Sequence, residues 1–89
     1  MIEVIWDPRF KRAYRKLMAR NSVLDDIFWE KLEILHEHPQ HPFLKTHKLS
    51  GKLQDCLAFS VDYKTRVLFK FIDETSVLLI DIGSHDDIY

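Results

Sequence analysis

The sequence predicts an α+β domain with the element order β-α-α-β-β-β, in which two N-terminal helices pack on one face of a small, mostly antiparallel sheet. Three observations support this prediction. A short β-type run opens the chain, two segments with helical spacing of apolar residues follow, and three apolar runs separated by short turns fill the second half. Because the chain has 89 residues, no internal repeat and no linker, we expect a single domain over residues 1–89.

The composition is that of an ordinary folded domain. Hydrophobic residues make up 46% of the chain and charged residues 30%, a balance that favours a packed core over disorder. The single cysteine, Cys56, excludes an internal disulfide and is interpreted as a small buried hydrophobe, and no Cys/His spacing typical of a zinc site is present. No apolar run approaches the roughly 18 residues of a membrane span, and the first residues do not form a signal peptide. We therefore expect a cytoplasmic protein with no metal site and no membrane contact.

A first helix is predicted after the opening strand at residues 2–6. Asp7 is expected to be its N-cap and Pro8 its first residue. Apolar residues follow at helical spacing, namely Phe10, Tyr14, Leu17 and Met18. Basic residues form a second stripe on the same helix, namely Arg9, Arg12, Lys16 and Arg20. This stripe is either a solvated face or a contact surface for nucleic acid or a protein partner.

A second helix is predicted to begin after Asn21, which offers a new N-cap, and to end by His38, because Pro39 disfavours helical backbone in the residue before it. Its apolar residues are Leu24, Ile27, Phe28, Leu32 and Leu35. Histidines at positions 36, 38 and 41 surround the proline. We interpret them as a solvated helix end rather than as metal ligands, because His36 and His38 are two residues apart and do not share a helix face.

The second half of the chain is predicted to form an antiparallel meander. Residues 57–61 alternate between large apolar and small or polar side chains, which is typical of a strand with one face on a core. A turn at 62–65 leads into a return strand over 66–72, and a turn at 73–75 leads into a central strand over 77–82. The return strand is expected to direct Val67, Phe69 and Phe71 toward the helices.

The opposite face of the sheet is expected to be uncovered, to carry Ser60 and Lys70, and to gather five residues that suit RNA cleavage: His47, Asp62, Arg66, His85 and Tyr89. The 2′-hydroxyl of RNA must lose a proton as it attacks the adjacent phosphate, and the 5′-oxygen must gain one as it leaves. Imidazoles serve both roles near neutral pH, and a guanidinium holds two phosphate oxygens at once. A tyrosine orients the sugar or stacks on a base.

Simpler interpretations of the same residues stay open at this stage. Arg66 and Asp62 flank a tight turn and form a plausible hairpin salt bridge. His85 and Tyr89 have a structural role as their alternative, although a chain end gains little by ordering a histidine and a tyrosine in a polar stretch.

The basic residues are unevenly distributed along a chain whose net charge is only −1. Residues 8–20 contain six basic residues and no acid, and residues 43–52 contain three lysines and a histidine and no acid. We predict RNA contacts from six basic residues, namely Arg12, Lys16, Lys45, Lys48, Lys52 and Lys70.

Three segments together resemble the RelE/ParE superfamily of bacterial type II toxins, and within it the RelE/StbE, YafQ-like branch. They are the Leu-Lys-Thr-His-Lys-Leu-Ser-Gly frame at 44–51, the hairpin at 59–71 and the Gly-Ser-His-Asp-Asp-Ile-Tyr ending at 83–89. The similarity covers nearly the whole chain. The combination of the leucine-x-glycine frame with the Gly-x-His-x-x-x-Tyr ending is more specific than either motif alone.

The resemblance implies the β-α-α-β-β-β fold and metal-independent cleavage of messenger RNA in the ribosomal A site, with no cofactor. It implies catalytic roles for His47, Asp62, His85 and Tyr89, and phosphate binding by Arg66. It also implies a cognate antitoxin, which covers the sheet or the helices and links the toxin indirectly to operator DNA. A helix in a groove and strand addition at a sheet edge both remain possible modes of antitoxin binding.

The sequence departs from the family pattern in the first meander strand, at residues 57–60. RelE proper has basic residues there and the YafQ-like branch has an additional histidine, whereas this chain has Leu-Ala-Phe-Ser. Two alternatives to a ribosome-dependent endoribonuclease therefore stay open. One is a ParE-like toxin that poisons DNA gyrase, and the other is a catalytically weak toxin that acts mainly in an antitoxin–operator complex.

Overall fold

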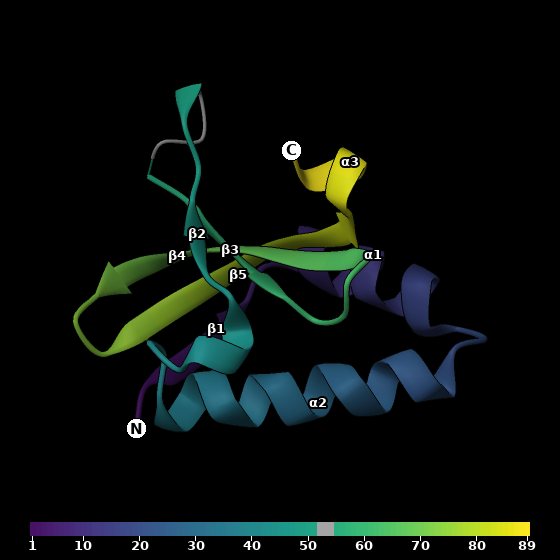
Figure 1. Ribbon diagram of the computed structural model, residues 1–89, viewed down its shortest axis with the longest axis horizontal. Helices are drawn as coiled ribbons and strands as arrows, with labels where there is room; N and C mark the ends of the chain where they lie inside the picture. The colour runs from purple at the N-terminus through teal and green to yellow at the C-terminus, as the bar shows by residue number, and fades with distance from the viewer. Residues whose placement is uncertain (52–54) are drawn as a thin grey trace.

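The computed structural model of the protein describes residues 1–51 and 55–89. The elements follow one another as β1 (Glu3–Trp6), α1 (Pro8–Met18), α2 (Ser22–Glu37), the 3-10 turn η1 (Pro42–Leu44), β2 (His47–Lys48), β3 (Leu57–Ser60), β4 (Thr65–Asp73), β5 (Ser76–Ser84) and α3 (His85–Ile88) (Figure 1). No helix within these residues is long and apolar enough to cross a membrane.

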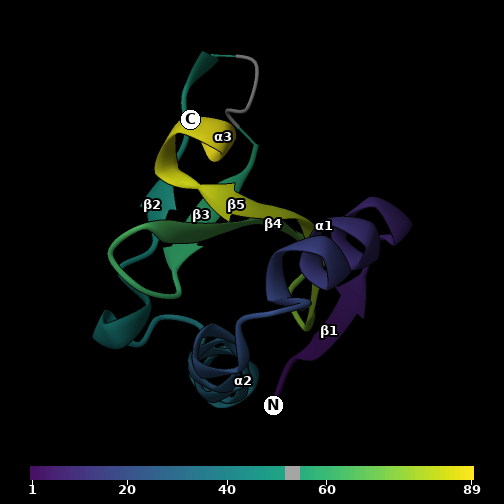
Figure 2. The ribbon, with the colours of Figure 1, turned by 90° about the vertical axis from the view of Figure 1, so that its right-hand side faces the viewer.

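The strands form one sheet with the order β1-β5-β4-β3-β2. β1 runs parallel to β5 at one edge, and every other neighbouring pair is antiparallel. Figure 2 shows the sheet between α1 and α2 on one side and α3 on the other. The predicted α+β fold, with two N-terminal helices on one face of a mostly antiparallel sheet, is confirmed.

Local sequence signals explain where the two long helices begin and end. The Asp7 carboxylate accepts a hydrogen bond from the Arg9 backbone N–H at 2.8 Å, and Pro8 occupies the first turn of α1. The Asn21 side chain accepts from the Leu24 N–H at 3.2 Å and caps α2. The α2 helix ends at Glu37, in agreement with the prediction that it ends by His38, and the His38 N–H donates to the Ile34 carbonyl.

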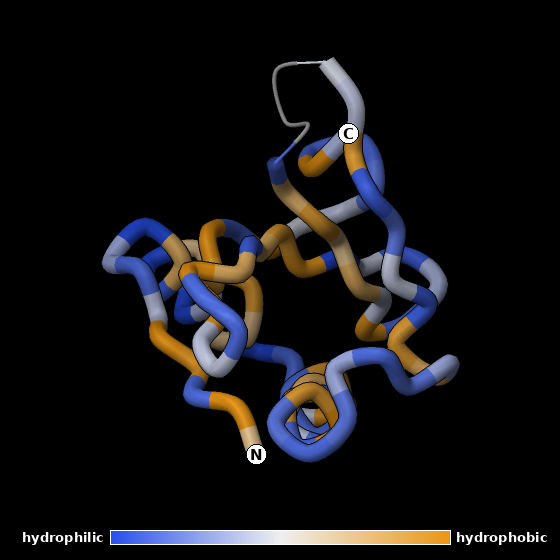
Figure 3. Tube along the Cα trace, turned by 90° about the vertical axis from the view of Figure 1, so that its left-hand side faces the viewer, coloured by the Kyte–Doolittle hydropathy of each residue, from blue (hydrophilic) through white to orange (hydrophobic). Residues whose placement is uncertain are grey.

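The main core lies between the helices and the sheet. α2 is amphipathic, and Figure 3, which views it nearly end-on, shows hydrophobic and hydrophilic residues on different sides of the helix. The largest side chains that lose all solvent contact are Phe10, Phe28, Leu35, Leu44, Phe59, Phe69 and Leu79. Val67 and Phe69 face the helices as predicted, whereas Phe71, near the end of β4, remains 37% exposed.

A second, smaller apolar cluster covers part of the other sheet face. Ala58 and Leu68 pack there against Ile88 of α3, with the partly buried Cys56 at the periphery. The expectation that this face is uncovered is therefore wrong at the end where α3 lies. The reason is that the last residues turn back as a helix and bury Ile88, instead of continuing the β5 strand.

Three short elements were not predicted. η1 has three residues and α3 has four. β2 has only two residues and pairs His47 with Ala58 and Lys48 with Leu57. None is long enough to give a periodic pattern in the sequence.

Of the three histidines near Pro39, His36 is not part of a solvated helix end as predicted. The Nδ1 atom of His36 lies 2.9 Å from the Ile2 carbonyl oxygen, and the Ile2 N–H donates to the His36 carbonyl at 2.9 Å. The imidazole is half-buried and joins the C-terminal turn of α2 to the start of β1. In the described part of the chain no three His, Cys, Asp or Glu side chains gather to hold a metal ion.

Aromatic side chains join α1 to α2. The Trp6 ring contacts Phe10, Tyr14 and Phe28, each at 5–6 Å between ring centres. The Tyr14 hydroxyl donates to Asp25 at 2.5 Å and accepts from the Trp29 indole N–H at 3.1 Å. Burial raises the pKa of Tyr14 above its usual value, and the hydrogen bond to the Asp25 carboxylate raises it further.

Replacing Tyr14 by Phe is expected to lower the free energy of unfolding by about 1–2 kcal/mol, because Asp25 and Trp29 each lose a hydrogen-bond partner. The loss should be measured at pH 7 by urea denaturation. The wild-type protein should also lose stability as the pH rises above about 10, since the unfolded chain releases the phenolic proton before the folded one does. Tyr63→Phe, at an 80% exposed position, is the matched control and should change neither quantity.

Candidate active site

Six residues from three separate parts of the chain line a pocket of about 400 Å³ on the α3 side of the sheet. They are His47, Lys48, Leu49, Arg66, His85 and Tyr89. Four of the five residues predicted to form the site are therefore brought together: the two histidines, the arginine and the tyrosine. β2, β4 and α3 with its C-cap residue supply them, and Figure 1 shows β2 and α3 extending toward the same side of the sheet.

His47 owes its position to the short edge strand β2. It lies opposite Ala58 of β3, and Ala58 lies opposite Leu68 of β4. Paired residues in neighbouring strands project from the same face of the sheet, so the imidazole shares its face with Ala58 and Leu68. The ring is exposed to solvent.

Arg66 follows the turn between β3 and β4, and that turn orients its side chain. Nη1 donates hydrogen bonds to the backbone carbonyls of Asp62, at 2.6 Å, and Thr65, at 3.1 Å. Nε is buried and has no hydrogen-bond partner among the described residues. An unpaired buried donor costs about 1–3 kcal/mol, so an anion that reaches this nitrogen would gain that amount in addition to the charge attraction.

Ser60 lies directly opposite Arg66 in the β3–β4 pairing. The residue is only 6% exposed, and within the described chain its hydroxyl also lacks a hydrogen-bond partner. The sequence pattern predicts that Ser60 lies on this face, but it does not predict a role for Ser60 in the site. Its burial beside an unpaired guanidinium nitrogen depends on strand register, which the sequence pattern does not reveal.

His85 is the first residue of the four-residue helix α3, and Tyr89 is its C-cap. Their rings contact each other edge-on, with centres 4.3 Å apart and planes 76° apart. The His85 Nδ1 atom lies 3.7 Å from the Asp86 carboxylate, in an exposed pair. The His85 backbone N–H donates to the Lys64 carbonyl at 3.0 Å, which ties α3 to the same turn that holds Arg66.

A capping box and a glycine allow α3 to fold back against β5. The Ser84 hydroxyl accepts from the Asp87 N–H, and the Asp87 carboxylate accepts from the Ser84 N–H, both at 3.2 Å. A Cβ atom on Gly83 would lie 3.0 Å from the Asp87 Cβ and 3.1 Å from its Oδ2. Glycine avoids this tight contact, because any other residue would have to displace the Asp87 side chain by a few tenths of an ångström.

Asp62 is the predicted catalytic residue that the structure does not bring to the pocket. Its Oδ1 accepts from the N–H groups of Lys64, at 3.0 Å, and Thr65, at 2.7 Å, and so stabilises the turn. Asp62 does not line the pocket that holds the other four. No ion pair joins it to Arg66 in the described residues, so the hairpin salt bridge considered above is also absent. The reason is that the side-chain alternation ends with β3, and the turn directs this carboxylate toward the helices.

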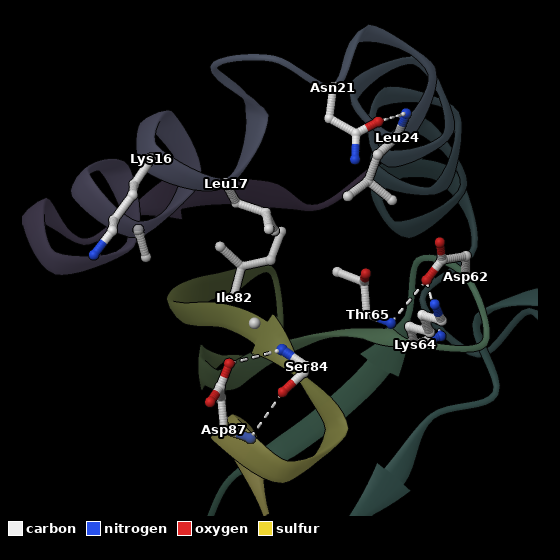
Figure 4. A pocket seen from close by; sticks show the side chains of 12 residues that line it. Lys16, Leu17, Asn21, Leu24, Asp62, Lys64, Thr65, Ile82, Ser84 and Asp87 are labelled. Carbon is white, nitrogen blue, oxygen red and sulfur yellow. Dashed lines mark hydrogen bonds between the residues drawn. The ribbon is translucent and has the colours of Figure 1, made fainter.

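The Asp62 side chain lines a different pocket, of about 640 Å³, between α1 and the end of β5. Figure 4 shows its carboxylate with Leu17 and Leu24 on one side and Ser84 and Asp87 on the other. This second pocket contains neither histidine of the first.

The predicted RNA-contact residues are distributed over several surfaces. Lys48 lines the first pocket, and Lys70 shares the face of β4 that carries Arg66. Lys45 is exposed at the turn before β2, with φ of 48°. Arg12 and Lys16 are exposed on α1, and Lys16 lines the second pocket instead. Lys52 lies outside the described residues.

Replacing Gly83 by Ala is expected to displace α3, because the added methyl meets Asp87 at 3.0 Å. Amide hydrogen exchange at Tyr89, whose N–H donates to the His85 carbonyl, should then become faster by an order of magnitude or more. Gly51→Ala is the matched control, because a Cβ atom there meets nothing within 4 Å. It strains a backbone with φ of 69° but should leave the exchange rate at Tyr89 unchanged. Equal exchange rates in both variants would contradict the proposed packing of α3.

No family model matches the sequence, and no curated protein matches it. Solved structures, in contrast, match the fold over nearly the whole chain. A metal-bound toxin from Helicobacter pylori is 20% identical with a TM-score of 0.80 and covers 100% of both chains. YafQ from E. coli strain BL21(DE3) is 12% identical with a TM-score of 0.80, over 100% of this chain and 99% of that chain.

A third match is the YoeB–YefM complex from Staphylococcus aureus, which is 14% identical with a TM-score of 0.77, over 96% of this chain and 98% of that chain. The TM-scores establish the shared fold, whereas sequence identities of 12–20% do not establish a shared chemistry, which must be argued from the residues of the pocket. The chain therefore has the fold of the RelE/ParE-type toxins that its sequence resembles.

Proposed function

We propose that the protein is the toxin of a type II toxin–antitoxin system and cleaves messenger RNA as a ribosome-dependent endoribonuclease. The observation that carries this proposal is the common pocket of His47, Arg66, His85 and Tyr89, which come from three separate segments. The family resemblance of these segments and the fold shared with toxins support it. This function requires a cytoplasmic location.

The reaction needs one base, one acid and one cation. One imidazole removes the proton of the 2′-hydroxyl, whose oxygen attacks the adjacent phosphorus. The other imidazole donates a proton to the departing 5′-oxygen. The products are a 2′,3′-cyclic phosphate and a 5′-hydroxyl, and no water molecule is consumed. His47 and His85 share these two roles, because they are the imidazoles that line the pocket.

Arg66 stabilises the charge that builds up on the phosphorane. Its Nη1 is already held by two backbone carbonyls, so the guanidinium reaches the phosphate with little loss of side-chain entropy. Tyr89, edge-on to His85, positions the nucleotide and restricts the orientation of the imidazole. Asp62 acts as a positioning residue: its carboxylate holds the turn and its carbonyl accepts from Arg66.

The lysines and the remaining arginine of the predicted RNA-contact set bind RNA by charge. Lys48 lines the pocket, and Lys45, Lys52 and Lys70 extend the contact to neighbouring phosphates of the messenger. Arg12 and Lys16, on α1, contact ribosomal RNA instead, since α1 lies on the other side of the sheet from the pocket.

The partner that restrains this activity is a cognate antitoxin, through which the toxin associates with operator DNA. Among the similar structures, YoeB is seen in complex with YefM, so the fold is known to bind a second protein chain.

Replacing His85 by Ala is expected to abolish growth arrest when the protein is induced without an antitoxin. Loss of a general acid or base lowers the cleavage rate by about 10²–10⁴-fold, and primer extension on messenger RNA measures that loss directly. His38→Ala, at an exposed histidine outside the pocket, is the control and should arrest growth like the wild type. Arrest by the wild type without messenger cleavage, together with a DNA-damage response, would instead identify a ParE-like gyrase poison.

Replacing Arg66 by Lys is expected to reduce cleavage by about 10²-fold or more, although the positive charge is kept. A lysine offers no planar fork, so it cannot bind two backbone carbonyls and the phosphate together. The rate should be measured on purified ribosomes programmed with a defined messenger. Lys31→Arg on α2, which lines neither pocket, is the control, and wild-type activity in Arg66→Lys would remove the guanidinium from the mechanism.

A further inference from the structure

Two buried polar groups beside the candidate active site have no hydrogen-bond partner among the described residues: the Ser60 hydroxyl and the Nε–H of Arg66. Ser60 is only 6% exposed, and it does not line the active-site pocket, whereas Arg66 does. Buried hydroxyls without a partner are uncommon in folded proteins, so this one requires an explanation. Because Ser60 is not part of the pocket wall, it can act on a bound molecule only through Arg66.

Strand register places these two groups next to each other. Ser60 of β3 lies opposite Arg66 of β4, and the adjacent residues Val61 and Thr65 are joined by a backbone N–H···O=C bond of 2.9 Å. Hydrogen-bonded and non-hydrogen-bonded pairs alternate along an antiparallel ladder, so Ser60 and Arg66 form a non-hydrogen-bonded pair. In such a pair the Cα atoms are about 4.5 Å apart and the side chains approach most closely. The Ser60 hydroxyl is therefore a near neighbour of the Arg66 stem, which carries Nε.

The Arg66 guanidinium is held at one end and unpaired at the other. Nη1 donates to the carbonyls of Asp62, at 2.6 Å, and Thr65, at 3.1 Å. Nε has no acceptor among the described residues. A small turn of the guanidinium about Nη1, or a change of the Ser60 rotamer, is enough to bring the Nε–H and the hydroxyl oxygen together, and neither movement changes the backbone.

We propose that Ser60 is a positioning residue, whose hydroxyl oxygen accepts the Nε–H of Arg66 when the pocket holds a phosphate. Nη2 binds the phosphate and turns the guanidinium about Nη1, until Nε reaches the hydroxyl. The two groups that are unpaired in the free protein then pair with each other, and this difference between the two states favours the complex. That the bound group is the scissile phosphate of messenger RNA rests on the proposed endoribonuclease function, whereas the pairing itself does not.

This role predicts opposite effects of Ser60→Ala on stability and on phosphate binding. The hydroxyl has no partner in the free protein, so its removal should leave the melting temperature unchanged or raise it. Affinity for inorganic phosphate, which serves as the probe, should fall by about fivefold or more, because Nε then has no acceptor in the complex either. A serine that only supports packing would instead give a lower melting temperature.

The binding should be followed by NMR on the full-length protein labelled with ¹⁵N, through the Nε–H signal of Arg66. In the wild type, added phosphate should shift this signal and slow the exchange of its proton with water, since the proton becomes hydrogen-bonded. Ser60→Ala should abolish the slower exchange, and Ser60→Thr, which keeps the hydroxyl, should restore it. Ser76→Ala is the matched control at another buried serine, 9% exposed and at the opposite end of β5, and should leave phosphate binding unchanged.

A double-mutant cycle isolates the pairing of the two side chains. Lysine has no Nε–H group, so Ser60→Ala should cause no further loss of phosphate affinity in the Arg66→Lys background. The same cycle on programmed ribosomes tests the link to RNA cleavage. There, Ser60→Ala alone should slow cleavage by about fivefold or more, and it should have no further effect when Arg66→Lys is present.

The proposal would be overturned by wild-type phosphate affinity in Ser60→Ala, or by an equal loss of affinity with and without Arg66→Lys. It would also be overturned if phosphate left the Arg66 Nε–H signal of the wild type unchanged, or if Ser60→Ala lowered the melting temperature together with the affinity. Phosphate binding is measured without RNA. A protein that did not cleave messenger RNA would therefore still show the pairing, and the two proposals can fail independently.

Discussion

The candidate site depends on the four-residue turn between β3 and β4. The Asp62 carboxylate accepts from two N–H groups of the turn and closes it. Two other carbonyls of the turn then face outward: that of Asp62 holds the Arg66 guanidinium, and that of Lys64 holds the first N–H of α3. One local structure thus sets the distance between the cation and the imidazole. The bonds within the turn and to Arg66 join residues close in sequence and require no distant loop closure, whereas the bond between His85 and Lys64 depends on the pairing of β4 with β5.

The long elements could be predicted from the sequence because their signals are local and repeated. Helical spacing places Phe10 and Phe28 in the core, and caps at Asp7 and Asn21 mark where α1 and α2 begin. Strand alternation assigns Val67 and Arg66 to opposite faces of β4, and the structure agrees. What escaped prediction is short: β2 and α3 have two and four residues, less than one period of any pattern.

The wrong prediction for Asp62 has a related cause, since the residue lies outside periodic structure. Asp62 was assigned to the α3 face by continuing the alternation of β3 two residues beyond the strand. Backbone in a turn no longer alternates, so the carboxylate lies on the helix side while its carbonyl faces the other way. The unpaired Ser60 hydroxyl and Arg66 Nε could not be anticipated either, since burial beside each other depends on strand pairing. The position of a site residue was predictable only where periodic structure fixed it.

The aromatic cluster between α1 and α2 has a consequence for spectroscopy. Both tryptophans of the chain belong to it, with the Trp6 and Trp29 rings 5.7 Å apart, and Tyr14 lies beside them. The candidate active-site pocket, in contrast, contains a tyrosine and no tryptophan. Intrinsic indole emission therefore reports the packing of β1 and α1 against α2. It should not respond to nucleotide in the pocket, which contains no tryptophan. A change in emission when a second molecule is added would locate the disturbance on the helical side of the sheet.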